Sequence, residues 1–320
     1  MIKDFFELIR WKSILLVAIT LIIVRVFVHD CFYEVFELSP ALSIPFYALF
    51  VLSVVLLVAS CSIADEIINK DKYKSIRDGK SFIGTLLQEQ AAKVLCIVLL
   101  VLSLATAYTI GALNGFVHLG TILIVLFGMM YFCSKRYSFQ PVAGKLLRAL
   151  CQALLFLLPT MFETACLANE PKLFEAIGQQ NVMIMMVMSL CFGGFAFMLS
   201  LLTEITADLR DIDDAKLINS RSFALYFGED ATKKTTYFLV VLLIAATAFF
   251  QYRYYQADKM IVLGGISILI YLPLLYFIKE MRSAKSVQDY DFLVKLLNMV
   301  FISLLFAMTS LKYVIPYALI

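Results

Sequence analysis

The sequence predicts an all-α membrane protein whose nine transmembrane helices form a single integral membrane domain, residues 1–320. The first supporting observation is composition: 62% of the 320 residues are hydrophobic, 16% are charged, and the mean hydropathy is +0.89. Soluble domains are about 45–50% apolar and about 25% charged. The second is a series of long apolar segments, and the third is the alternating charge of the loops between them. The net charge of +3 is too small to indicate nucleic acid as a partner.

Nine segments are long and apolar enough to cross a bilayer, which takes about 20 residues of helix. They are 13–29, 42–64, 91–110, 114–133, 145–163, 180–203, 235–251, 260–278 and 296–316. No long polar insertion separates them, so the lipid bilayer is the expected environment of the whole chain. The seven cysteines are scattered and form no CxxC pair. They are expected to be small core residues, not a disulfide framework or a zinc site.

Basic residues gather in every second loop. The first loop, 30–40, contains three acids and no Lys or Arg, whereas the second, 65–90, contains five basic residues, Lys70, Lys72, Lys74, Arg77 and Lys80. Cytoplasmic loops carry an excess of Lys and Arg. The N-terminus and the even-numbered loops are therefore predicted to be cytoplasmic and the C-terminus to lie outside. The segments 65–90 and 204–228 fall on the cytoplasmic side.

The sixth apolar segment turns acidic at its end. On a helix, Glu204, Asp208 and Asp211 fall at i, i+4 and i+7, which is one face. Carboxylates at the mouth of a membrane span are costly and mark a functional site by default. Mg²⁺ prefers oxygen ligands and is often bound together with substrate phosphates. The spacing thus favours a Mg²⁺–phosphate site over the alternative of a solvated acidic loop.

A second polar group follows the second apolar segment. Asp65, Asn69 and Tyr73 fall at i, i+4 and i+8, and Glu66 adjoins them. Two acidic groups on the same side of the membrane would repel each other, and a divalent cation would relieve that repulsion. The alternative is an ordinary polar helix end. Lys145 lies inside an apolar segment and is a candidate functional cation, whereas Arg148 is expected to extend toward the lipid headgroups.

The segment DLRDIDDAKLINSRSFALYFGE resembles the second Asp-rich motif of the UbiA superfamily of intramembrane prenyltransferases. That motif is approximately D-x-x-D-x-x-x-D, followed by a glycine and a basic residue. Asp208 and Asp211 match its first two acids. Ala215 stands where the last acid is expected, and Asp214 beside it is the candidate replacement. Arg221 keeps the basic position.

The first motif of that family is N-D-x-x-D-x-x-x-D. An ungapped alignment places Asp65, Glu66, Asn69 and Tyr73 on its four defined positions. All four differ from the consensus, and three of them still offer oxygen ligands. Lys80, in the run KSFIG, resembles the basic residue that follows this motif. The resemblance extends over nearly the whole chain.

Membership of this superfamily implies nine helices around a central cavity, over which the two motifs face each other. It also implies that Mg²⁺ bridges the carboxylates and the diphosphate of an isoprenyl diphosphate, whose prenyl group passes to a lipophilic acceptor. The implied metal ligands are Asp65, Glu66, Asn69, Asp208 and Asp211; the implied catalytic residues are Asp208, Asp211 and Glu66; the implied substrate-binding residues are Asn69, Tyr73, Lys80, Lys145, Arg221 and Asp214. The alternatives are a membrane terpene cyclase of the same family and a non-catalytic isoprenoid-binding homologue.

Overall fold

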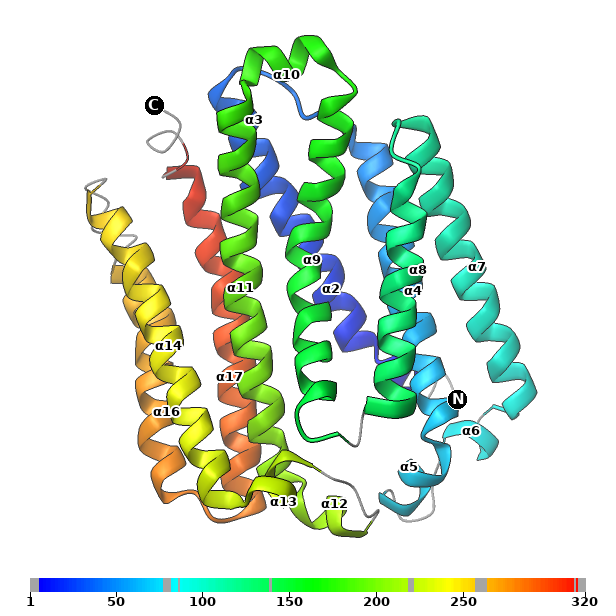
Figure 1. Cartoon of the computed structure of the whole chain (residues 1–320), viewed down its shortest axis with the longest axis vertical. Helices are drawn as coiled ribbons and strands as arrows, with labels where there is room; N and C mark the ends of the chain where they lie inside the picture. Colours follow the sequence, from blue (N-terminus) through cyan, green and yellow to red (C-terminus); the bar gives the residue numbers. More distant parts are fainter. Residues whose placement is uncertain are drawn as a thin grey trace. The chain divides into compact units, whose positions relative to one another are not determined.

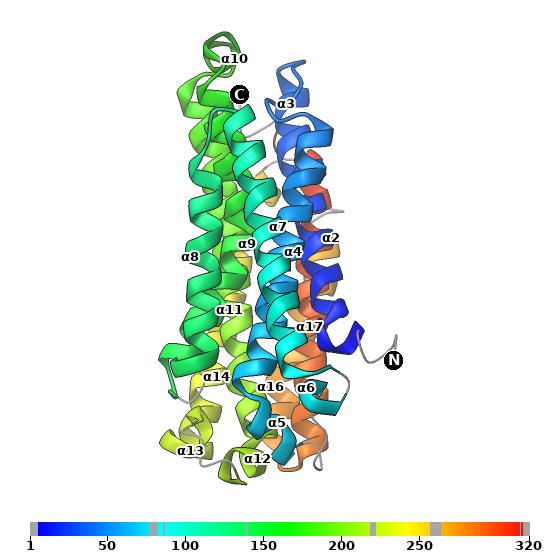
Figure 2. The same ribbon diagram turned by 90° about the vertical axis from the view of Figure 1, so that its right-hand side faces the viewer.

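The computed structural model describes residues 6–76, 82–85, 87–137, 140–217, 222–256, 264–313 and 315. Long helices joined by short turns dominate it (Figures 1 and 2). Within these residues, nine helical segments are long and apolar enough to span a membrane: Trp11–Glu34, Ile44–Ile68, Glu89–Leu113, His118–Arg136, Ala143–Ala168, Gln179–Arg210, Glu229–Phe249, Gly264–Ser283 and Val287–Lys312. Each overlaps one of the nine predicted segments, so the predicted all-α membrane architecture is confirmed.

The chain divides into two compact units, each made of several chain segments. The first unit takes its residues from Met1–Ile22, Pro40–Ser138 and Leu158–Val182, and the second from Ile23–Ser39, Phe139–Leu157 and Met183–Ile320. The predictions of a single domain and of a central cavity concern both units together and stay predictions.

The first unit is built on two helices that lie side by side, α4 (Ile44–Ile68) and α7 (Glu89–Leu113). Small residues allow their backbones to approach closely. Ser60 Oγ donates a hydrogen bond to the Cys96 carbonyl at 2.9 Å, and Ser103 Oγ donates to the Ser53 carbonyl at 2.6 Å. The remaining elements wholly within this unit are α5 (Lys70–Ile76), α6 (Phe82–Thr85), α8 (His118–Phe132), η2 (Cys133–Tyr137) and α10 (Pro171–Ile177).

An apolar cluster holds the residues before helix α2 (Trp11–Val24) against the end of α4. Leu8, Ile63 and Ile83 are almost fully buried in it. The chain then turns at Arg10, whose φ of 54° lies in the left-handed region. This turn directs the Arg10 side chain toward the last turn of α4.

The second unit contains the acidic end of helix α11 (Gln179–Arg210) and the helices that follow it. Its other elements are η1 (Arg25–Asp30), α3 (Cys31–Val35), the first part of α9 (Ala143–Ala168), α12 (Ile212–Leu217), α13 (Phe223–Phe227), α14 (Glu229–Gln256), η3 (Ser267–Tyr271), α16 (Leu272–Ser283), α17 (Val287–Met308) and η4 (Thr309–Tyr313). Polar contacts join the beginning of α14 to the turn between α16 and α17. Lys233 Nζ donates to the Ala284 carbonyl at 2.8 Å, and the Tyr290 hydroxyl donates to Glu229 Oε1 at 2.8 Å.

Two spans extend at least seven residues past a predicted end. The sixth continues to Arg210, so Glu204 and Asp208 lie on the helix itself. The ninth begins at Val287, well before the predicted residue 296, because a capping box starts it. Ser286 Oγ accepts a hydrogen bond from the Asp289 amide, and the Asp289 carboxylate accepts one from the Ser286 amide. Polar residues can satisfy the first turn of a helix, and a search for apolar runs overlooks them.

The seven cysteines are free thiols, and five of them are buried. This agrees with the prediction that they are small core residues.

Candidate functional site

The first acidic cluster, defined as Asp65, Glu66, Asn69 and Tyr73, lies at the end of α4. Asp65, Glu66 and Asn69 are 7%, 2% and 5% exposed. The Asn69 amide donates to the Asp65 carbonyl and the Tyr73 amide to the Asn69 carbonyl, both at 2.9 Å. The helical ladder therefore continues from α4 into α5. As the i, i+4, i+8 spacing predicts, Asp65, Asn69 and Tyr73 come together.

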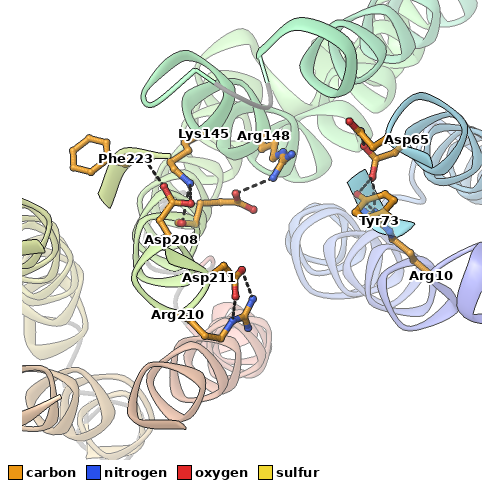
Figure 3. Close-up of polar contacts among 11 residues, drawn as sticks. Arg10, Asp65, Tyr73, Lys145, Arg148, Asp208, Arg210, Asp211 and Phe223 are labelled. Carbon is orange, nitrogen blue, oxygen red and sulfur yellow. Dashed lines mark hydrogen bonds and ion pairs between the residues drawn. The ribbon is translucent and has the colours of Figure 1, made fainter. Parts of the chain in front are cut away.

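Three side chains donate hydrogen bonds to the Asp65 carboxylate. The Tyr73 hydroxyl and Arg10 Nη2 lie 2.7 Å and 2.5 Å from Oδ2 (Figure 3), and Asn69 Nδ2 lies 2.9 Å from Oδ1. Asn69 Oδ1 in turn accepts from Lys72 Nζ at 3.0 Å. Tyr73, which the resemblance assigns to substrate binding, is thus bonded to an acid of its own cluster.

Burial and these contacts shift the pKa values of the two groups that bond to Asp65 Oδ2, the Tyr73 phenol and the Arg10 guanidinium. Burial, together with the negative charge of Asp65, raises the pKa of Tyr73 to about 12. The phenol therefore stays protonated at neutral pH and donates. Burial alone would lower the pKa of Arg10, but the charge of Asp65, followed by Tyr73 and Glu66, outweighs it and raises that pKa. The Arg10 guanidinium is consequently a permanent cation in contact with the cluster.

The second acidic cluster, defined as Glu204, Asp208 and Asp211, lies at the end of α11. Two cations on the first turns of α9 contact it (Figure 3). Lys145 Nζ lies 2.7 Å from Asp208 Oδ1 and 3.0 Å from the Glu204 carbonyl, and Arg148 Nη1 lies 3.1 Å from Glu204 Oε2. Lys145 is 9% exposed. The Glu204 carboxylate binds the Arg148 guanidinium, so Arg148 has a partner within the protein, and its extension toward the lipid headgroups stays a prediction.

A backbone amide at the start of α13 also contacts Asp208. The Phe223 amide, in the first turn of α13, donates to Asp208 Oδ2 at 2.6 Å. Ser222 caps this short helix by accepting a hydrogen bond from the Leu225 amide. Both carboxylate oxygens of Asp208 therefore have donors, one charged and one neutral.

The third acid of the predicted face has a different partner. Asp211 follows the last residue of α11, and the adjacent Arg210 binds it through Nε at 2.6 Å and Nη2 at 2.8 Å. Its side chain is 46% exposed. The spacing is helical, as predicted, but Glu204 and Asp208 contact the cations of α9, whereas the adjacent Arg210 guanidinium binds Asp211 (Figure 3).

Asp211 opens onto a pocket of about 580 Å³ between the end of α11, α12 and α17. The charged residues that line it are Arg210, Asp211, Asp213, Asp214, Asp291 and Lys295. Asp214 and Asp211 therefore line one cavity. The expectation that Asp214 supplies the missing acid of the motif stays a prediction.

Two predicted substrate-binding residues, Lys80 and Arg221, lie outside the described residues. Arg10 contacts the first cluster and Arg148 contacts the second. Neither residue is among the site residues predicted from the sequence. A left-handed turn brings Arg10 to Asp65, and neither its conformation nor its target has a local sequence signal. The position of Arg148, three residues after Lys145 on one helix, could have indicated a shared face.

Mg²⁺ takes oxygen ligands at about 2.0–2.1 Å and keeps several waters. Among the described residues, no group of three or more His, Cys, Asp and Glu side chains is placed to hold a metal ion. Asp65 and Asn69 of the first acidic cluster fit Mg²⁺ poorly, because donors already bond to both oxygens of Asp65 and to the amide oxygen of Asn69. The second fits better, because Asp211 and Asp214 line an open, solvent-accessible cavity and exposed ion pairs exchange at little cost.

In the comparison with known proteins, the matches are to solved structures. No protein-family model and no curated protein matches the sequence. A solved digeranylgeranylglyceryl phosphate synthase matches with a TM-score of 0.64 and 18% identity over 98% of both chains. A UbiA homologue from Archaeoglobus fulgidus bound to GPP and Mg²⁺ matches with a TM-score of 0.57 and 17% identity, covering 94% of this chain and 99% of that one. The same homologue bound to DMAPP and Mg²⁺ matches with a TM-score of 0.56.

Proposed function

Because the chain has the UbiA-type fold of a multi-pass integral membrane protein, we propose that it is an intramembrane prenyltransferase of the UbiA superfamily. In this proposal it ionises an allylic isoprenyl diphosphate in a Mg²⁺-dependent step and transfers the prenyl group to a lipophilic acceptor. Two structures of the same fold hold GPP or DMAPP with Mg²⁺. The observation that carries the proposal is the pair of cations, Lys145 and Arg148, at the acidic mouth of α11.

Lys145 and Arg148 have the chemistry of a diphosphate site. A lysine ammonium binds phosphate as a point charge, and an arginine guanidinium can bind two phosphate oxygens at once. Lys145 is buried, so its charge acts through a medium less polar than water. Both groups would donate to the oxygens of the leaving diphosphate, where negative charge develops as the allylic bond breaks.

The carboxylates of the second acidic cluster have a complementary role. When Lys145 and Arg148 turn to a diphosphate, Asp208 and Glu204 lose the cations that neutralise them here. Asp208, with Asp211 and Asp214 at the adjoining pocket, would then be available as oxygen ligands. Mg²⁺ bound there would act as a Lewis acid on the leaving diphosphate. Glu66, a member of the first acidic cluster that is 2% exposed, remains a proposed catalytic residue that rests on the resemblance alone.

A specific observation favours a second candidate, a non-catalytic isoprenoid-binding homologue. Asp65, Glu204, Asp208 and Asp211 each have a cationic partner within the protein. Ion pairs of this kind could be the permanent state of a chain that has lost the reaction.

The deciding experiment uses purified chain in nanodiscs with geranyl, farnesyl and geranylgeranyl diphosphates, with and without Mg²⁺. We expect Mg²⁺-dependent release of diphosphate that is lost in Lys145→Met and retained in the matched control Lys216→Met, whose lysine is exposed. A prenylated acceptor in the lipid extract identifies a transferase, and a cyclic product formed without an acceptor identifies a terpene cyclase. Binding of the diphosphates without release under any condition would contradict the proposal and support the non-catalytic candidate.

A further inference from the structure

The first acidic cluster balances its charge without a metal ion. Asp65 and Glu66 bring two negative charges, and Arg10 and Lys72 bring two positive ones. Arg10 Nη2 contacts Asp65 at 2.5 Å, and Lys72 Nζ contacts Asn69 at 3.0 Å while the charge of Asp65 acts on it. The repulsion between the carboxylates of this cluster is therefore already offset within the first unit.

The oxygens that would coordinate a metal ion are also in use. Asp65 accepts one hydrogen bond at Oδ1 and two at Oδ2. The Asn69 side chain donates to Asp65 and accepts from Lys72, so both ends of its amide are engaged. Tyr73 contributes a neutral phenol that donates to Asp65. A metal ion could bind here only by displacing several of these donors together.

The backbone around Arg10 is shaped to present its side chain. Left-handed φ values are unfavourable for arginine, so this turn needs compensating contacts. The Arg10 carbonyl accepts hydrogen bonds from the Ser13 amide at 2.8 Å and the Ile14 amide at 3.3 Å, which start α2. Leu8, two residues earlier, is fully buried. Arg10 is thereby fixed at both its backbone and its guanidinium.

We infer that Arg10 takes the position of a metal ion at Asp65, and that Asp65, Asn69 and Tyr73 form a metal-free structure. In this role Arg10 is a positioning residue: it ties the end of α4 and the beginning of α5 to the residues before α2. Tyr73 supports it, because its hydroxyl lies 3.1 Å from Arg10 Nη2 and 2.7 Å from Asp65 Oδ2. The inference concerns the first unit alone and does not depend on the proposed reaction.

The test counts bound Mn²⁺, a spectroscopic substitute for Mg²⁺, on the full chain in nanodiscs by electron paramagnetic resonance. Arg10→Gln exposes the Asp65 carboxylate, and we expect this variant to bind about one more Mn²⁺ per chain than the native protein. The matched control is Lys12→Gln, which removes the same charge from an exposed position two residues away and should leave the count unchanged. Adding Asp65→Asn to Arg10→Gln should abolish the extra ion.

Asp65→Asn in the native background keeps the inference testable even if Arg10→Gln fails to fold. We expect its Mn²⁺ count to equal that of the native chain. A lower count in Asp65→Asn, or no extra ion in folded Arg10→Gln, would overturn the inference. Absence of diphosphate release would count against the proposed function but would not alter these Mn²⁺ counts, so the two failures are distinguishable.

Discussion

The two acidic clusters have similar side chains but differ in how they hold them. In the first, Asp65 is 7% exposed and is bonded to three donors: Tyr73 in α5, Asn69 at the C-cap of α4, and Arg10 in the turn before α2. In the second, Asp211 is 46% exposed and lines a pocket of about 580 Å³. Among the described residues, its ion-pair partner is the adjacent Arg210. A buried, fully bonded carboxylate contributes to folding, whereas an exposed one in a cavity can change partners. We therefore expect the first cluster to act as a structural element and the second as a binding site.

The largest expected effect is a loss of diphosphate release when the second cluster is altered. Asp208→Asn removes the charge that holds Lys145 while keeping the shape that accepts the Phe223 amide. We expect diphosphate release to fall about 10²- to 10³-fold, the loss typical when one preorganised electrostatic group is removed. Steady-state kinetics with the preferred diphosphate would measure it. The control Asp230→Asn, at an exposed position early in α14, should stay near the native rate, and an active Asp208→Asn enzyme would contradict the assignment.

The next effect is a loss of stability in the first cluster. Asp65→Asn leaves Arg10 without its carboxylate and weakens the bonds from Tyr73 and Asn69. Hydrogen bonds to charged groups contribute about 1.5–3 kcal/mol each, and the half-exposed Arg10 can regain water, so we expect the free energy of unfolding to fall by about 2 kcal/mol. Urea or thermal unfolding in nanodiscs would test this. Native stability in Asp65→Asn would show that the network is not structural.

A smaller effect is expected at alkaline pH. The pKa of Tyr73 is raised to about 12 in the folded chain, against about 10 for an unperturbed tyrosine. The folded state therefore favours the protonated phenol, and this contribution is complete below pH 10 and is lost as the pH rises through 12. The difference in melting temperature between the native chain and Tyr73→Phe should shrink over that range. A constant difference would refute the raised pKa.

The smallest effect on stability is expected at the exposed ion pairs of Glu89, the first residue of α7. Glu89 binds Lys70 at 3.0 Å and Lys93 at 2.6 Å, and all three side chains are well exposed. Exposed ion pairs contribute little, so Glu89→Gln should leave the melting temperature almost unchanged. A clear destabilisation would mean that α5 depends on these pairs more than on the Asp65 network.

The sequence predicts the helices well because membrane spans leave long apolar runs. It also predicts that Asp65, Asn69 and Tyr73 meet, since helical spacing is a local property. It does not predict Arg10 at Asp65, because the contact joins residues 55 positions apart through a left-handed turn. Nor does spacing show that Asp208 and Asp211 have different partners. Asp208 binds Lys145 and Asp211 binds Arg210, and this difference depends on the positions of the side chains in three dimensions.

The most direct test of the difference between the clusters is the Mg²⁺ concentration that half-saturates diphosphate release, compared in Asp65→Asn and Asp211→Asn. We expect an unchanged value in Asp65→Asn and a higher value in Asp211→Asn, because the second cluster offers exchangeable oxygens. A higher value in Asp65→Asn with an unchanged value in Asp211→Asn would place the metal at the first cluster and contradict this assignment.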